Sequence, residues 1–413
     1  MPMKCFGSFT TAIFVVLLFG GVDVIRTEFP APQKQLKTYS LPIDTKSADI
    51  SPDEQLVVTV FTVKKDRAES GDTPYSDFIQ LWNIKDEHLV AEYSAPSPDV
   101  RISSSRYVGS DVAYPPEGLR VVRFSPDGRM VWALIGRTIH LLRSTDLTEM
   151  RSIHLVKPDD VTRTVHGKTF VGRYEIHSME LSPGGDVMAV LWVRGTRYGK
   201  TQLYTLAVGN IVANWDIPEG WISYAGSLIW HPNGKLLLIA VPNQQPCRYA
   251  NNRPDVFAFD AQTGAVRHEL TTGLQVGGIA VTSDSRVLAV QRSCFQLSKR
   301  SGRQLGVFDL STGKHLRNVS GRETGMHDSV SVSADGSRFL AFTGDVKTKF
   351  DWLDATSYGV VVDETFSVWN LANYDGIVTS QNIPGLKRSG LRLSSKGKYA
   401  VSFGGASFVY ELP

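Results

Sequence analysis

The sequence predicts an all-β fold, a seven-bladed β-propeller with four-stranded blades. Three observations lead to this prediction: a turn motif that recurs seven times, a short apolar strand after each turn, and no helical periodicity after the first 25 residues. The composition is that of a folded globular chain, since 42% of the 413 residues are apolar and 21% are charged. The predicted propeller spans residues 36–413.

The repeated turn is clearest at Phe124-Ser125-Pro126-Asp127-Gly128, where the Pro and the Asp-Gly pair mark a tight reversal of the chain. An apolar residue, a small polar residue or His, and then a turn recur at a spacing of about 50 residues, which indicates repeated supersecondary units. The seven copies begin at Ile50, Phe124, Leu181, Trp230, Val281, Val332 and Leu393.

Each turn is followed by three predicted strands and preceded by one. The strand before the turn alternates apolar and other residues, which indicates one buried face. A fully apolar strand such as Met130–Ile135 follows the turn, and the next strand carries an aromatic residue and then an acid or amide, as in Trp82-Asn83 and Phe308-Asp309. A fourth strand follows a short turn such as Ser311-Thr312-Gly313. Four antiparallel strands in each repeat form the blade of a β-propeller.

The last repeat is one strand short, because the chain ends soon after Tyr410-Glu411. The segment Leu36–Leu41 reads as a strand that belongs to no repeat of its own. We expect this amino-terminal strand to complete the seventh blade, which would close the ring without an open sheet edge.

These residues resemble a divergent member of the WD-repeat family (WD40-like or YVTN-like) among the seven-bladed β-propellers. The Phe-Ser-Pro-Asp-Gly turn, the apolar strand after it and the Trp-Asn or Phe-Asp third strand carry the resemblance. The resemblance implies the propeller fold and leaves the function open, because such propellers perform many tasks.

The first 25 residues are predicted to be a signal peptide, and residues 26–35 a linker. Met1–Lys4 is a short basic start, and the apolar stretch Ala12–Val22 ends at Asp23. Eleven residues would span only about 16 Å as a helix, so we expect no stable membrane span. The predicted location is therefore periplasmic or extracellular, where Cys247 and Cys294 could form a disulfide or remain two separate thiols.

The sequence contains no signature for a metal, a cofactor or a nucleic-acid partner. The net charge is only +3, from 44 basic and 41 acidic residues, so no overall field favours nucleic acid. The nine His residues are scattered, and His166 is the best loop candidate for acid–base chemistry.

The longest predicted loops all fall on one face of the propeller, and long loops on a rigid scaffold are the usual place for binding. These predicted loops are Lys64–Asp77, Ser94–Gly118, Lys157–Glu175, Pro242–Asp255, Arg292–Arg303 and Asp345–Glu364. Arg and aromatic residues, which are enriched at interface hot spots, occur in them. The predicted binding residues are Tyr107, Arg173, Tyr174, Arg197, Tyr198, Arg248, Tyr249, Arg253, Arg300 and Trp352.

Two functions remain open from the sequence. The first is an exported, non-enzymatic module that binds a protein or peptide through the long-loop face, with an anionic ligand on the basic loops of blades three to five as an added hypothesis. The alternative is a propeller enzyme, of the lactonase, hydrolase or quinone-dependent dehydrogenase type, with its site near the axis. The axial residues in that case would be Arg120, Glu180, Asp328 and Arg392.

Overall fold

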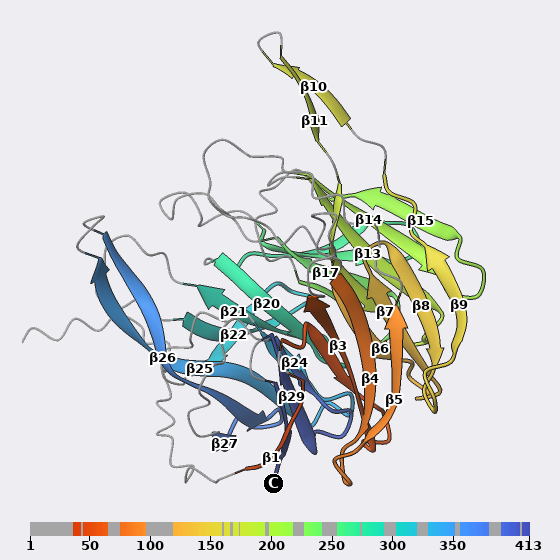
Figure 1. Ribbon diagram of the computed structural model, residues 1–413. Coiled ribbons are helices and arrows are strands. Elements are labelled where there is room, and N and C mark those ends of the chain that lie inside the picture. Colours follow the sequence, from red (N-terminus) through yellow and green to blue (C-terminus); the bar gives the residue numbers. More distant parts are fainter. Residues whose placement is uncertain are drawn as a thin grey trace, which may run out of the picture.

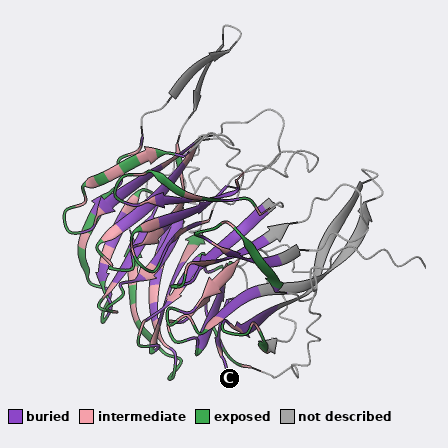
Figure 2. Ribbon diagram, turned by 180° about the vertical axis from the view of Figure 1, so that it is seen from behind, coloured by how far each residue is buried: buried purple, intermediate pink, exposed green. Residues whose placement is uncertain are grey.

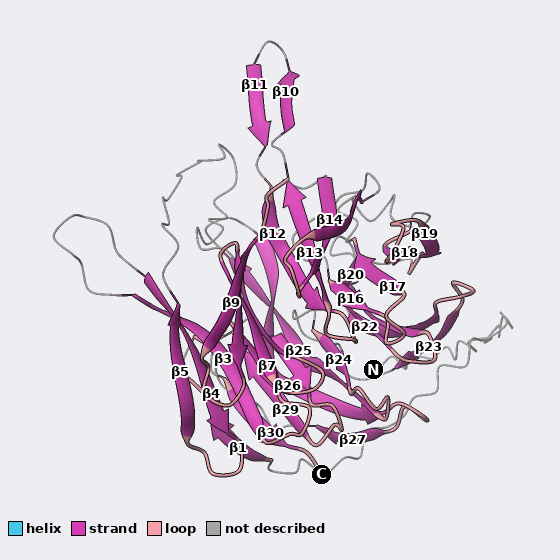
Figure 3. Cartoon of the chain, turned by 90° about the vertical axis from the view of Figure 1, so that its right-hand side faces the viewer, coloured by secondary structure: helices cyan, strands magenta, loops and turns pink. Residues whose placement is uncertain are grey.

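The structure is a computed structural model in which strands are the regular elements of the described chain (Figure 3). It describes residues 36–42, 44–64, 75–95, 119–158, 161–165, 168–172, 174–194, 198–217, 227–241, 254–272, 275–292, 303–319, 329–351, 356–379, 390–404 and 407–413. This part of the chain contains no helix long and apolar enough to cross a membrane.

Seven four-stranded antiparallel sheets surround a central axis, so the predicted β-propeller is confirmed (Figure 1). The innermost strands are β2 (Ser47–Ile50), β6 (Arg120–Phe124), β12 (Glu175–Leu181), β16 (Leu228–Trp230), β20 (Gln275–Val281), β24 (Val330–Val332) and β28 (Gly390–Leu393). The second strands are β3 (Leu56–Lys64), β7 (Met130–Ile135), β13 (Val187–Arg194), β17 (Leu236–Ala240), β21 (Arg286–Arg292), β25 (Arg338–Asp351) and β29 (Tyr399–Phe403).

The two remaining strands of each blade lie toward the rim. The third strands are β4 (Tyr75–Asn83), β8 (Thr138–Arg143), β14 (Tyr198–Thr205), β18 (Val256–Asp260), β22 (Arg303–Asp309), β26 (Thr356–Asn370) and β30 (Phe408–Glu411). The outermost strands are β5 (Leu89–Ala95), β9 (Glu149–His154), β15 (Ile211–Asp216), β19 (Val266–Leu270), β23 (His315–Val319), β27 (Gly376–Thr379) and β1 (Lys37–Ser40).

The ring is closed where β1 pairs antiparallel with β30. Thr38 lies opposite Tyr410 and Lys37 opposite Glu411, so the first described strand forms the outer edge of the seventh blade. This pairing confirms the closure predicted from the sequence. We call it the seam.

The hydrophobic core lies between neighbouring blades (Figure 2). Consecutive residues of a strand face opposite sides of its sheet, and both Val57 and Val58 of β3 are at most 1% exposed. A second strand is therefore covered by a blade on each side, which explains why its sequence is apolar throughout rather than alternating. One cluster joins Val58 and Ile79 of the first blade to Phe124 and Val131 of the second.

The turn motif is explained by a repeated set of hydrogen bonds. The Ser125 hydroxyl donates to Asp127 Oδ1 (2.6 Å) and accepts the Met130 amide (2.9 Å). Ser51 and Ser333 make the same bonds in their own turns. A small hydroxyl residue, an acid two positions later and a tight turn are thus one unit, because the side chains satisfy the backbone of the reversal.

The seventh turn has Lys396 where most others have an acid, and Glu54 of the first blade supplies the missing carboxylate. Glu54 Oε1 accepts hydrogen bonds from the Ser394 hydroxyl (2.5 Å) and the Lys396 amide (3.0 Å). Glu54 is only 6% exposed. The seventh blade is therefore joined to the first by this contact as well as by the seam.

The acid or amide after the third-strand aromatic residue caps the next turn. Asp260 Oδ1 accepts the amides of Gln262 (3.1 Å) and Thr263 (2.9 Å). The hydrogen bond from the Thr263 amide, followed by those from Arg267 and the Thr263 hydroxyl, lowers the pKa of Asp260 to about 2. The aromatic residue before it, Phe259, is 1% exposed and packs between blades. The two halves of the pair therefore have separate structural roles.

Two of the predicted long loops contain strands. The hairpin of β10 (Val161–Val165) and β11 (Lys168–Gly172) lies within Lys157–Glu175. Asp345–Glu364 belongs largely to β25 and β26, which stay paired out to Asp351 and Thr356. The prediction of loops was wrong for these two segments. The part of a strand that extends beyond the core contains polar as well as apolar residues, and such a sequence resembles a polar loop.

Gly234 and Gly264 provide a matched test of turn geometry, since both have a positive φ, of 69° and 71°. A Cβ at Gly264 would lie 2.8 Å from Cγ of Trp215, whereas one at Gly234 would have no atom within 4 Å. We expect Gly234→Ala to cost about 1 kcal/mol from the backbone alone and Gly264→Ala to cost clearly more. Urea unfolding followed by tryptophan fluorescence measures both, and equal shifts in midpoint would contradict the packing at Trp215.

Candidate functional site

The two faces of the disc differ in their connections. The turns between first and second strands and between third and fourth strands, such as residues 51–55 and 84–88, make one face, which we call the turn face. The other connections make the opposite face, which we call the long-connection face. They include residues 65–74, 96–119, 155–174, 241–255, 293–302 and 320–329. Figure 1 shows the β10–β11 hairpin standing beyond the blades at this end.

Two of the ten predicted binding residues fall within the described chain. Tyr174 directly precedes β12 and packs, partly buried, against the cluster that contains Met179 and Trp192. Tyr198 is the first residue of β14, paired with Arg194 at the end of β13. Both therefore lie on blade three at the long-connection face. The other eight lie outside the described residues, as do Cys247, Cys294, His166 and Asp328: Tyr107, Arg173, Arg197, Arg248, Tyr249, Arg253, Arg300 and Trp352.

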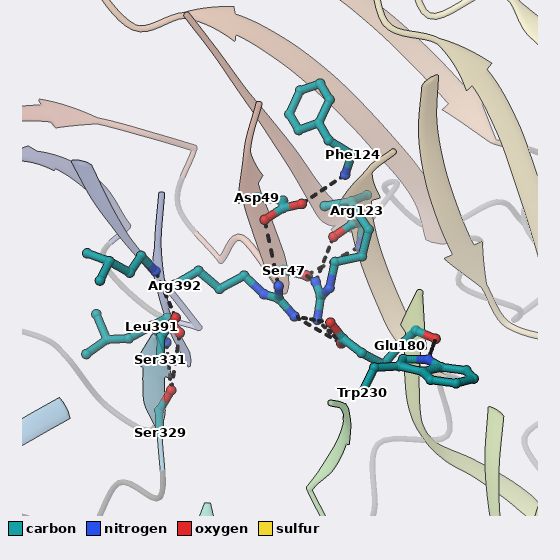
Figure 4. A network of polar contacts seen from close by, with 12 residues as sticks. Ser47, Asp49, Arg123, Phe124, Glu180, Trp230, Ser329, Ser331, Leu391 and Arg392 are labelled. Atoms are coloured by element: carbon teal, nitrogen blue, oxygen red, sulfur yellow. Dashed lines mark hydrogen bonds and ion pairs between the residues drawn. The ribbon is translucent and has the colours of Figure 1, made fainter. Parts of the chain in front are cut away.

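The structure brings charged side chains together at the axis. Each innermost strand contributes one residue to this level, directly before the apolar residue of its turn motif. These residues are Asp49, Arg123, Glu180, Ile229, Ala280, Ser331 and Arg392. Four of the seven are charged, and Figure 4 shows these four converging from blades one, two, three and seven. We call these four residues the axial cluster.

An ion pair crosses the axis within this cluster. Arg392 Nη2 of blade seven lies 3.1 Å from Glu180 Oε2 of blade three, and these blades are three positions apart in a ring of seven (Figure 4). Arg123 Nη2 reaches the same oxygen at 3.4 Å, and Arg392 Nη1 lies 3.8 Å from Asp49 Oδ1. Two cations and two anions thus neutralise one another across four blades.

Polar side chains of the innermost strands also bond to the backbone of the next blade. Asp49 Oδ2 accepts the Phe124 amide (2.8 Å), and Ser331 Oγ accepts the Leu393 amide (3.0 Å). The innermost strands of neighbouring blades are not paired as a sheet, so their inward amides need other acceptors. The polar residues at the axis therefore link neighbouring blades through hydrogen bonds.

Burial shifts the pKa values of two residues of the axial cluster. It raises the pKa of Asp49, and the positive charges of Arg392 and Arg123 only partly oppose this. Burial also lowers the pKa of Arg123, with the nearby charge of Arg392 acting in the same direction. Because each charge is costly to bury alone, the four are stable as a mutually paired group.

Two axial residues were missed by the sequence reasoning, and one was placed wrongly. Glu180 and Arg392 lie at the axis as predicted, but Asp49 and Arg123 were not recognised. Arg120 does not line the axis, because it is buried between blades one and two in an ion pair with Asp77 of β4. Arg123 stands directly before Phe124, the apolar residue of the turn motif, whereas Arg120 does not. This position in the motif would have identified Arg123 rather than Arg120 as the axial residue.

The innermost strand of blade three, β12, contains a β-bulge at His177. Ile176 pairs with Trp192 and Ser178 with Leu191, which leaves His177 as the extra residue of β12. Burial lowers the pKa of His177, so its imidazole is neutral at pH 7. Bulges often re-aim a side chain beside a functional site, and the bulge at His177 lies two residues from the start of β12, where the connection from blade two enters blade three.

Asp255 lies where the long connection of blade four returns to β18. Its carboxylate is buried and accepts hydrogen bonds from the Thr272 amide (3.1 Å) and hydroxyl (2.5 Å). Burial raises the pKa of Asp255 to about 7. The only acid in the predicted basic loops of blades three to five is therefore withdrawn from the surface and partly neutral at pH 7.

The axial cluster can be tested with a double-mutant cycle. We expect Arg392→Met to lower the free energy of unfolding by roughly 1–3 kcal/mol, since it leaves Asp49 and Glu180 with less positive charge. The double variant Arg392→Met/Glu180→Gln should lose less than the sum of its two single variants. Urea unfolding at pH 7 measures the three variants, and strict additivity would contradict an ion pair across the axis.

The raised pKa of Asp255 predicts that the stability of the folded protein depends on pH. Its folded pKa of about 7 lies above the ordinary 3.8, so the favourable contribution is complete below pH 4 and is lost as the pH rises through 7. Asp255→Asn keeps an acceptor for Thr272 and carries no charge. We expect the stability of this variant relative to the parent protein to rise by up to about 4 kcal/mol between pH 4 and pH 8. Thermal melts across that range measure it, and a constant difference would refute the shift.

The described residues contain no group of three His, Cys, Asp or Glu side chains that could hold a metal ion. Comparison with known proteins adds no annotation: no protein-family model matches the chain, and no curated protein matches it either. The seven-bladed β-propeller therefore stands on the strand pairing itself, and the likeness to WD repeats remains a resemblance of motifs.

Proposed function

We propose that this protein is an exported, non-enzymatic interaction module that holds a protein or peptide partner against its long-connection face. The observation that carries the proposal is the difference between the two faces. On the turn face, hydrogen-bonded turns of a few residues close the blades. On the other face, the same rigid blades carry many connections of ten or more residues, such as 65–74 and 241–255, together with the β10–β11 hairpin.

A rigid scaffold under long connections suits recognition. The blades share buried cores along the ring, so each connection starts and ends on a fixed strand: residues 241–255, for example, run from β17 to β18. Sequence variation in such connections changes the surface without changing the fold. Arg and Tyr residues in them supply large contact area and hydrogen bonding, as at interface hot spots.

The axial cluster favours this function over the enzyme alternative. A hydrolase, lactonase or dehydrogenase site near the axis would need polar groups that remain available to a substrate. The axial charges in the described chain instead bond to one another, as Arg392 does with Glu180, or to backbone, as Asp49 does with the Phe124 amide. These contacts give the axial cluster a structural role in joining blades.

The basic connections of blades three to five bear on the chemistry of the partner. The connections between second and third strands in these blades, with the strand ends beside them, contain Asp255 as their one acid against nine basic residues: Arg194, Arg197, Lys200, Arg248, Arg253, Arg292, Lys299, Arg300 and Arg303. Asp255 is buried, and the Lys200 side chain lies 3.7 Å from Asp216 of β15. Basic residues therefore outnumber acids in the sequence of these connections. We accordingly infer that the partner presents an acidic surface there, which would make its binding sensitive to salt.

The proposal is tested by recovering the partner from the extracytoplasmic fraction of the native organism with the full-length protein as bait. We expect the double variant Tyr249→Ala/Arg248→Ala to lower recovery about tenfold or more, as the loss of two hot-spot side chains would do. Quantitative mass spectrometry of the recovered proteins gives the readout.

A matched control removes one charged and one apolar side chain from the turn face. Arg129 and Val208 are exposed there, and Arg129→Ala/Val208→Ala should leave recovery unchanged. Equal recovery by all three proteins, or an equal loss in both double variants, would reject the long-connection face as the binding surface.

A further inference from the structure

Blade six has the longest pair of strands in the described chain, β25 and β26. β25 and β26 pair from Arg338 opposite Asn370 to Asp351 opposite Thr356, with one shift of register between Thr343 and Asp345. Their neighbours are much shorter: β24 pairs only with Phe339–Ala341, and β27 only with Ser367–Trp369. The outer part is thus a two-stranded ribbon, which we call the blade-six arm and define as Asp345–Asp351 with Thr356–Val362. Figure 1 shows it reaching away from the other blades.

The arm is about 23 Å long, at roughly 3.3 Å for each of its residue pairs. Within the described chain, each of its strands is paired along one edge only. An isolated two-stranded ribbon is marginally stable in water, and its free edges are templates for another strand. The arm is therefore a place where the fold offers strand pairing to a partner.

The two free edges differ sharply in sequence. The β25 edge has a charge at every second position: Asp345, Lys347, Lys349 and Asp351. Such alternating charges are a usual protection against edge pairing. The β26 edge, Thr356–Val362, has the sequence TSYGVVV, which contains no charge and no proline and is rich in residues that favour strands. Only the β26 edge is left without this protection.

The β26 edge is also complementary to itself. Antiparallel pairing of two copies about Gly359 places Tyr358 opposite Val360, and this aromatic–β-branched pair is a favourable one. No charges meet in this arrangement. The same operation on β25 about Thr348 would place Lys347 opposite Lys349, so two like charges would face each other. Self-pairing is thus compatible with one edge of the arm and opposed by the other.

We propose that a second copy of this chain pairs with the β26 edge of the blade-six arm. The two arms then form a four-stranded sheet in the order β25–β26–β26–β25, with a twofold axis near Gly359. Twofold, self-complementary interfaces are the commonest way in which identical chains associate. This inference is independent of the proposed partner on the long-connection face, because the arm alone supplies the contact.

The test is the mass of the full-length protein in solution, measured by size-exclusion chromatography with light scattering over a range of concentrations. The parent protein should move from one chain toward two as the concentration rises. Val361→Lys places a charge on the β26 edge and should weaken association at least tenfold. A parent protein that stays a single chain up to its solubility limit would overturn the proposal.

Thr348→Lys is the matched control. It makes the same charge change in the same arm, and Thr348 lies opposite Gly359, two positions from Val361, so the two sites share one face of the ribbon. This variant should associate like the parent protein. Equal loss of association in both variants would overturn the assignment to the β26 edge.

Hydrogen exchange on the parent protein tests the pairing of two β26 edges even if Val361→Lys fails to fold. Amides within residues 356–362 should exchange more slowly at high than at low protein concentration, because pairing protects them. Exchange that is independent of concentration, or that slows only when a different protein is added, would overturn self-pairing.

Discussion

The seam is the constraint on which the rest of this structure depends. Every blade covers the second strand of its neighbours, so the core is complete only when the ring is complete. Pairing of Thr38 with Tyr410 supplies the last sheet edge, and Glu54 completes the turn of blade seven from blade one. An open ring would expose an unpaired edge and two apolar blade faces at once.

The axial cluster shows how a ring of blades can have polar groups at its centre. Opposite charges from Arg392 and Glu180 meet across the axis, while Asp49 and Ser331 satisfy amides of the neighbouring blades. A purely apolar axis would leave those amides without acceptors. These side chains therefore serve the scaffold, because each of them bonds across the axis or to a neighbouring blade.

Much of the fold could be predicted because its signals are local. The hydroxyl–acid turn at Ser125 and Asp127, the aromatic residue and cap at Phe259 and Asp260, and the apolar second strands each follow from bonds within a few residues or from burial on both faces. Contacts between distant residues were harder. No local pattern predicts that Arg120 pairs with Asp77. Nor does one predict that Glu54 supplies the carboxylate for the turn in which Lys396 stands in place of an acid, since these two residues lie far apart in the sequence.

The candidate binding site was predictable only in outline. Loop length predicted the long-connection face as the place for binding, whereas eight of the ten predicted binding residues, Tyr249 and Arg248 among them, lie outside the described residues. The arm of blade six was misjudged because Lys347 and Lys349 look like loop residues until the pairing partner is known. Asp345–Asp351 and Thr356–Val362 form strands by pairing with each other, and neither sequence alone predicts this.

The seam also sets an order of events during translation. β1 precedes the six other blades along the chain and β30 follows them, so the seventh blade stays incomplete until both strands have been synthesised. Pairings so distant along the chain form slowly. A polypeptide without β30 would leave β1 with nothing to join. Closure of the disc thus depends on two strands from opposite ends of the propeller sequence.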